Sequence, residues 1–162
     1  MKKLIVLMTC YIITSGILAQ TQSVDDVKRH SVFVELGGNS FIYSLNYDYK
    51  IDVSKKLQVA VGSGFSYPIF TKTIDAFDGI NITPSINLLY GEKKGKLEIG
   101  CALLTGISKS ENYYIPSFRI GVRYLWKNGF LFRAGIVTLF PQGSDDFHFI
   151  VPLPGLSFGY TF

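Results

Sequence analysis

The chain has 162 residues, of which 48% are hydrophobic and only 17% are charged, and its formal net charge is +4 at pH 7. This length suggests one domain, and so weak a basic balance does not indicate a nucleic-acid partner. Aromatic residues at 15% and 16 glycines both exceed ordinary usage and, without helical periodicity, favour β structure.

Residues 1–19 have the organisation of a cleaved export signal. Lys2 and Lys3 precede a mostly apolar stretch, and Ala19 offers a cleavage point. The apolar stretch is too short for a good spanning helix, although a retained anchor helix is the alternative. Cleavage leaves a net charge of +2 and Cys101 as the single cysteine, so no intramolecular disulfide is possible.

Residues 20–30 are polar and predict a short periplasmic lead-in, after which residues 31–162 alternate with a period of two. The clearest stretch is 41–51, where aromatic and aliphatic residues occupy every second position. An amphipathic helix does not place this pattern on one face. The alternation predicts eight strands, at 32–37, 41–51, 57–67, 80–90, 97–103, 116–126, 130–140 and 156–162.

The predicted connections differ in length from one end of the strands to the other. After a brief turn at 37–40, short connections alternate with long ones, at 52–56, 68–79, 91–96, 105–114, 127–129 and 141–154 in chain order. Short periplasmic turns and longer outer loops are typical of outer-membrane barrels. The sequence therefore predicts an all-β chain that forms an eight-stranded antiparallel up-and-down transmembrane β-barrel.

Aromatic residues gather at both ends of the predicted strands on the apolar face. Beside the short turns they are Tyr47, Tyr49, Tyr90, Tyr124, Trp126, Phe130, Phe132, Tyr160 and Phe162. At the other end they are Phe41, Tyr43, Phe65, Tyr67, Phe118 and Phe140. Two such girdles mark membrane interfaces, while packing in a soluble sandwich is the alternative.

The opposite face of the strands carries matched charges. They are Glu35, Asp48, Lys50, Glu98, Arg119, Arg123 and Arg133. An eight-stranded barrel has an interior just wide enough for side chains to fill, and unpaired charges there are costly. We expect these residues to form an interior polar network, unless an open sheet turns them to bulk water.

The last strand ends the chain on an aromatic residue. Its apolar face carries Leu156, Phe158, Tyr160 and Phe162. With the opening Glu35-Leu-Gly-Gly-Asn39 and the stretch Tyr43-Ser-Leu-Asn-Tyr47, this ending resembles the small eight-stranded outer-membrane β-barrel proteins over essentially the whole mature chain. The resemblance implies a bacterial outer-membrane location, with outer-membrane lipid and the barrel-assembly machinery, which reads the terminal alternation, as partners.

No motif predicts a cofactor, a metal site or a catalytic residue. Ser144, Asp145, Asp146 and His148 lie together in the last long connection, but neighbours in a polar loop do not make a catalytic triad. Lipid A deacylases, which are enzymes on barrels of this size, have a His-x-Ser pair, whereas Ile150 stands two residues after His148 here. A lipid-modifying enzyme is therefore not expected.

We expect a monomer with a closed, side-chain-filled lumen that acts as a structural or surface-interaction protein through its outer loops, where an extracellular ligand or protein would bind. A transporter or binder of a small or apolar molecule at the barrel mouth is the alternative. A soluble lipocalin-like barrel would instead turn the apolar residues inward. On the membrane hypothesis Ile86→Lys and Val122→Asp block assembly, and Gly121→Ser is tolerated.

Overall fold

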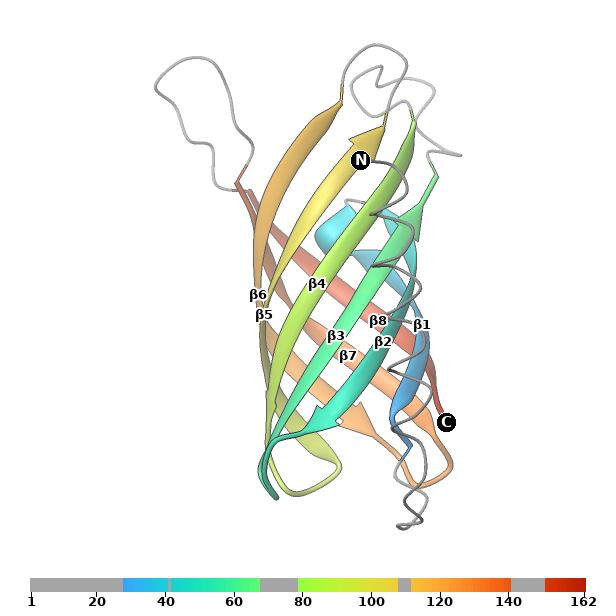
Figure 1. Ribbon diagram of the computed structural model, residues 1–162, viewed down its shortest axis with the longest axis vertical. Coiled ribbons are helices and arrows are strands. Elements are labelled where there is room, and N and C mark those ends of the chain that lie inside the picture. Colours follow the sequence, from blue (N-terminus) through green and yellow to red (C-terminus); the bar gives the residue numbers. More distant parts are fainter. Residues whose placement is uncertain (1–27, 41, 68–78, 108–111, 141–150) are drawn as a thin grey trace, which may run out of the picture.

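The computed structural model describes residues 28–40, 42–67, 79–107, 112–140 and 151–162. They form a closed barrel of eight antiparallel strands in chain order, which confirms the predicted fold (Figure 1). Within these ranges no helix is both long and apolar enough to cross a membrane. The expected signal at 1–19 and residues 20–27 of the lead-in lie outside the described residues.

Each strand pairs with the next along the chain, and β8 pairs back with β1. The elements are β1 (His30–Gly37), η1 (Gly38–Ser40), β2 (Tyr43–Asp52), β3 (Leu57–Ser66), β4 (Ile80–Tyr90), β5 (Gly95–Ile107), β6 (Tyr113–Leu125), β7 (Phe130–Leu139) and β8 (Val151–Thr161). Turns 53–56, 91–94 and 126–129 join strands at one end, which we call the short-turn end. The opposite end is the long-connection end.

The seam between β1 and β8 closes the barrel. Val34 pairs with Phe158 and Ser31 pairs with Thr161 in an antiparallel register. Beyond the last strand residue, the His30 amide donates to the Phe162 carbonyl at 3.0 Å, and the Phe162 amide donates back at 2.8 Å. The pairing runs without a break from Ser31 and Thr161 to Gly37 and Gly155, so β1 leaves no free edge on this side.

The strands β5 and β6 are longer than the alternation predicts. β5 continues to Ile107 and β6 begins at Tyr113, so the expected connection at 105–114 shrinks to residues 108–112. The reason lies in the inward positions at this end, where Leu104 and Ile115 are apolar and buried. With apolar residues on both faces, the period of two disappears from the sequence although the strand continues.

The strand β8 also begins earlier than predicted, at Val151 rather than residue 156. Its first part contains Pro152 and Pro154, which pair with β7. The pairing of β8 with β1 starts only at Gly155, so the two prolines have a neighbouring strand on one side only. A strand tolerates the missing proline donor at such an edge position.

The apolar face of the wall points outward and the charged face points inward. Ile86, Ile120 and Ile136 are each more than half exposed, at 53%, 55% and 55%. In contrast, Glu35 and Glu98 are each only 1% exposed. This arrangement is the reverse of the lipocalin-like alternative, which requires the apolar residues inside.

The connection between β1 and β2 folds into the lumen instead of extending beyond it. Figure 1 places η1, drawn in cyan, within the ring of strands. Gly37 and Gly38 adopt φ values of +71° and +67°, which residues with a side chain rarely adopt. Ser40 is 8% exposed, so the sequence Gly-Gly-Asn-Ser forms a turn as predicted but one that fills interior space.

Close contact between β6 and β7 depends on two glycines that face each other. Gly121 pairs with Gly135, and a Cβ atom on Gly121 would lie 2.4 Å from the Ala134 carbonyl oxygen and 2.8 Å from the Gly135 Cα. Both contacts are with backbone, which cannot rotate away. The expectation that Gly121→Ser is tolerated is therefore wrong.

We predict that Gly121→Ala lowers the free energy of unfolding by about 1–3 kcal/mol, as overpacking does in other well-packed interiors. The matched control is Gly64→Ala, because the Cβ there meets Oδ1 of Asn46 at 2.4 Å, the end of a side chain that can rotate. Urea unfolding followed by circular dichroism measures both variants. Equal losses in the two variants would contradict the packing argument.

Candidate functional site in the barrel interior

The seven charged residues expected inside the barrel all lie in the lumen of the structure. They come from five strands, and none is more than 4% exposed: Glu35 on β1, Asp48 and Lys50 on β2, Glu98 on β5, Arg119 and Arg123 on β6, and Arg133 on β7. The register brings these distant sequence positions together across the barrel. Their burial means that each charge must find its partner among protein groups.

Glu98 is the centre of the larger group. Arg123 donates from Nε and Nη2 to the two oxygens of Glu98, at 3.2 and 3.1 Å. Arg133 makes the same paired contact, with Nε at 3.0 Å from Oε2 and Nη2 on Oε1. Arg123 and Arg133 sit directly opposite each other on β6 and β7, so one carboxylate neutralises the repulsion between two neighbouring guanidinium groups.

Two further groups complete the coordination of these arginines. Asp48 accepts a hydrogen bond from Nη1 of Arg123 at 2.7 Å. The ring of Phe33 lies 4.5 Å from the Arg133 guanidinium carbon and 6.0 Å from that of Arg123. Phe33 is 4% exposed, so it fills the lumen beside the ion pairs and offers its electron-rich face to the cations.

A second ion pair lies nearer to η1. Arg119 contacts Glu35 through Nη2 and Oε1, and both side chains are almost fully buried. Two glycines make room for this pair, because a Cβ on Gly38 would lie 2.7 Å from Glu35 Oε1 and a Cβ on Gly155 would lie 3.1 Å from the same atom. The left-handed turn before η1 therefore also creates the space in which this ion pair lies.

At the short-turn end the polar interior continues as a chain of side chains. Lys96 donates to Gln58 Oε1, and Gln58 donates to Asp52 Oδ1 at 2.5 Å. Lys50 lies deeper in the lumen and is 4% exposed. Among the described residues it makes no ion pair with a carboxylate.

Above the ion pairs, η1 is held by hydroxyl contacts. Ser117 on β6 donates to Asn39 Oδ1 at 2.9 Å, and the hydroxyls of Ser40 and Thr83 lie 3.4 Å apart. These contacts tie η1 to β4 and β6 on the far wall. The turn therefore acts as a plug that spans the lumen.

The lumen becomes apolar toward the long-connection end. A buried cluster there consists of Leu104, Ile115, Val137 and Leu139, with Tyr113 and Leu153 packed against it. Tyr113 donates to Asn81 Oδ1 at 2.5 Å. The interior is thus divided into a charged part below η1 and an apolar part at the mouth.

The described residues contain no cluster of three or more His, Cys, Asp or Glu side chains that could hold a metal ion. Cys101 is exposed on the outer wall. The hydroxyl, carboxylate and imidazole cluster at 144–148 lies outside the described residues.

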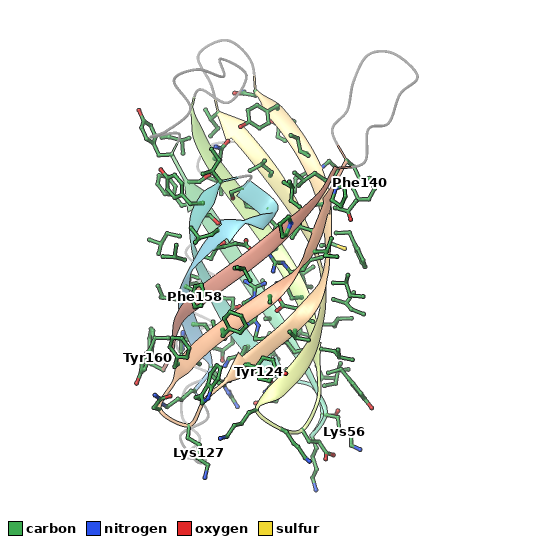
Figure 2. All side chains as sticks on the ribbon, turned by 180° about the vertical axis from the view of Figure 1, so that it is seen from behind. Lys56, Tyr124, Lys127, Phe140, Phe158 and Tyr160 are labelled. Carbon is green, nitrogen blue, oxygen red and sulfur yellow. The ribbon has the colours of Figure 1, made fainter. Side chains whose placement is uncertain are left out.

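The four apolar residues of the last strand point outward. The exposed fractions lie between 44% and 57% for Leu156, Phe158, Tyr160 and Phe162. Figure 2 shows Tyr160 near the short-turn end and Phe140 near the long-connection end. Phe158 packs against Phe132 of β7 with 5.2 Å between ring centroids. Their inward neighbours Ser157 and Thr161 are fully buried.

Sequence reasoning missed the apolar and neutral side chains that share the interior with the charges. Phe33, Leu104 and Val137 occupy inward positions of their strands. The alternation of inward and outward positions along each strand is the signal that could have identified them. The sequence prediction names only the charged members of that face. The inward fold of η1 had no signal of its own, because Gly-Gly-Asn-Ser indicates a turn without its direction.

Comparison by sequence finds no matching protein family and no matching curated protein. Comparison by structure finds the N-terminal β-barrel domain of Pseudomonas aeruginosa OprF, with a TM-score of 0.51. The match covers 83% of this chain and 96% of that domain, at 12% sequence identity. What the two share is the fold.

We predict that Glu98→Gln lowers the free energy of unfolding by about 3–5 kcal/mol, because two buried arginines lose their common counter-charge. Glu92→Gln is the control, since Glu92 makes an exposed ion pair with Lys56 at 3.2 Å, and its loss costs at most about 1 kcal/mol. Urea titration of both variants measures the difference. Similar midpoints would mean that the interior charges do not depend on Glu98.

Proposed function

We propose that this chain is a bacterial outer-membrane β-barrel protein with a closed lumen, and that it acts as a structural or surface-interaction protein. The observation that carries the proposal is the outward apolar wall. Exposed apolar and aromatic side chains lie on every strand of the barrel. Val34 on β1, for example, is 45% exposed, and Tyr90 on β4 is 57% exposed. In water such a surface far exceeds the apolar patches that monomeric proteins expose, whereas lipid is its natural solvent.

The dimensions and the ends of the barrel agree with this setting. Seven of the strands have 10 to 13 residues, which suits tilted strands that cross a hydrocarbon layer. Trp126 and Tyr124 at the short-turn end, and Phe65 and Phe140 at the other, are exposed as interfacial aromatic residues are. We assign the short turns to the periplasm and the long connections to the outside, where a ligand or protein would bind.

The interior supports a closed scaffold rather than an aqueous pore. The arginine–carboxylate groups around Glu98, the Arg119–Glu35 pair and η1 succeed one another along the lumen. Leu89 and Leu131, which are fully buried, fill further space among them. The proposed role needs no cofactor and no enzymatic activity, and the barrel is proposed to work as a monomer.

Assembly by the barrel-assembly machinery is part of the proposal. The outward residues of β8, from Leu156 to Phe162, form an uninterrupted apolar row at the seam strand. A machine that receives the last strand in an open state would meet this row and the unpaired edge of β8 together. Export through a cleaved signal at residues 1–19 is the step that precedes it.

A second candidate function is the binding or transport of a small apolar molecule at the mouth. The buried cluster of Leu104, Ile115, Val137 and Leu139 favours it, because these side chains make the interior apolar at the long-connection end. The charged groups and η1 lie below it. The cluster therefore suits a molecule that binds at the mouth better than one that crosses the barrel.

We predict that Ile86→Lys prevents stable membrane assembly. Ile86 is 53% exposed in the middle of β4, and a lysine at this depth costs about 2–4 kcal/mol. The control is Val53→Lys, which places the same charge in the first short turn, where Val53 is 58% exposed and the cost is about 0–1 kcal/mol. Recovery in the outer-membrane fraction measures both, and recovery of the parent chain as a detergent-free soluble monomer would overturn the proposal.

We predict that the purified barrel gives no steady conductance in planar lipid bilayers, because ion pairs and the η1 plug occupy the lumen. Glu98→Ala combined with Arg133→Ala removes one buried ion pair and is expected to increase the frequency of transient current steps. A stable channel in the parent protein would favour transport over the closed scaffold.

A further inference from the structure

The short-turn end of the barrel carries a basic rim. It consists of Lys28, Arg29, Lys55, Lys56, Lys93, Lys94 and Lys127. All except Lys28 are exposed. Figure 2 shows Lys56 and Lys127 at the same end of the barrel, both pointing away from it.

Few carboxylates offset this charge. Arg29 pairs with Asp52 at 3.5 Å and Lys56 pairs with Glu92 at 3.2 Å, and both pairs are exposed. Among the described residues the other rim lysines make no ion pair with a carboxylate: Lys55, Lys93, Lys94 and Lys127 as well as Lys28. The seven rim cations and these two carboxylates together carry a net side-chain charge of +5.

The rim follows the whole circumference of the barrel. Its members lie on the three turns that join β2 to β3, β4 to β5 and β6 to β7, and on the residues that lead into β1. A folded partner that docks on one side would meet only part of such a ring. A partner that surrounds the barrel, as membrane lipid does, meets all of it.

Aromatic residues lie next to the rim on the outer wall. Trp126 precedes Lys127 directly and is 39% exposed, and Tyr90 near the second short turn is 57% exposed. The ammonium of Lys28 lies 5.3 Å from the centre of the Tyr160 ring. Aromatic side chains mark the boundary of the hydrocarbon, so lysines just beyond them reach the level of the lipid phosphates.

The sequence of the long connections has the opposite balance. Residues 68–79, 105–114 and 141–154 contain two lysines and five acidic residues. The excess of positive charge is therefore confined to the short-turn end and is not spread over the whole protein. This difference in charge between the two ends favours a negatively charged partner that contacts only the short-turn end.

We propose that the basic rim binds the phosphate groups of anionic phospholipids in the leaflet that faces the short turns. This inference rests on the proposed membrane location and goes beyond it, because an apolar wall alone does not discriminate between anionic and zwitterionic lipids. The rim contributes affinity through charge, and each lysine near such a surface strengthens the attraction for anionic lipid about fivefold. An acidic periplasmic protein is the competing partner, and the test separates the two.

The chain has a single tryptophan, Trp126, which reports on lipid at the rim. The mature protein is reconstituted in bilayers that contain either brominated phosphatidylcholine or brominated phosphatidylglycerol, which quench tryptophan fluorescence on contact. We expect phosphatidylglycerol to reach half-maximal quenching at about a fivefold lower mole fraction at low ionic strength. The ratio of the two half-maximal mole fractions is expected to approach one at about 1 M salt, because the Debye length is then only about 3 Å.

Two variants connect the preference to the rim. Changing Lys55, Lys93, Lys94 and Lys127 together to Gln is expected to abolish the preference, whereas the same four changes to Arg keep it. Lys72→Gln with Lys109→Gln, in the long connections, is the matched control and leaves it unchanged.

The outcomes separate this inference from the membrane location. Equal quenching by the two lipids in the parent protein overturns the lipid preference and leaves the barrel in the bilayer. A preference that survives the four changes to Gln likewise overturns the role of the rim. Absence of quenching by either lipid overturns the membrane location itself.

Discussion

The hydrogen bonds that join β1 to β8 impose the constraint on which the rest of this barrel depends. Once the sheet closes, each residue of a strand points either into the lumen or away from it, with no intermediate choice. The register Val34 to Phe158 places both residues outside, and the adjacent pair Glu35 to Ser157 is then inside. A slip of β1 by one residue would put Glu35 on the outer wall and turn Val34 and Leu36 into the lumen, so the seam also fixes the chemistry of both faces.

The interior charges make this choice of register more specific. Glu98 is bound by two arginines that the register holds opposite each other, and Asp48 takes a remaining donor of Arg123. A displaced strand would leave at least one of these groups buried without its counter-charge, at a cost of several kcal/mol. The ion pairs thus stabilise one alignment of strands more than they stabilise the folded state in general. Phe33 adds a cation–π contact that only this alignment allows.

The sequence predicts most of the strands of the barrel wall but only some of the side chains that fill the lumen. Strict alternation from Tyr43 to Ile51 predicts β2 because its outward and inward residues differ in polarity. At Leu104 and Ile115 both faces are apolar, so the alternation ends β5 too early and starts β6 too late. All seven interior charges were found by parity, since a charge on an otherwise apolar strand is conspicuous.

The contacts among those charges required the register across strands that are distant in the chain. The choice of Glu98 as the common partner of two arginines depends on how β5 is staggered against β6 and β7. The sequence around residue 98 contains no information about this register. The path of η1 was likewise unpredictable, because a turn that enters the lumen and one that leaves it use the same residues.

The distance along the chain between the two seam strands has a consequence for biosynthesis. Ser31 and Thr161, whose hydroxyls lie 3.1 Å apart, are separated by 130 positions. The first strand to leave the ribosome therefore waits for the last one, and during that time its edge is open to pairing with other chains. Until residues 151–161 are made, β1 lacks one of its two neighbouring strands, and a product truncated before residue 151 would remain an unsealed sheet.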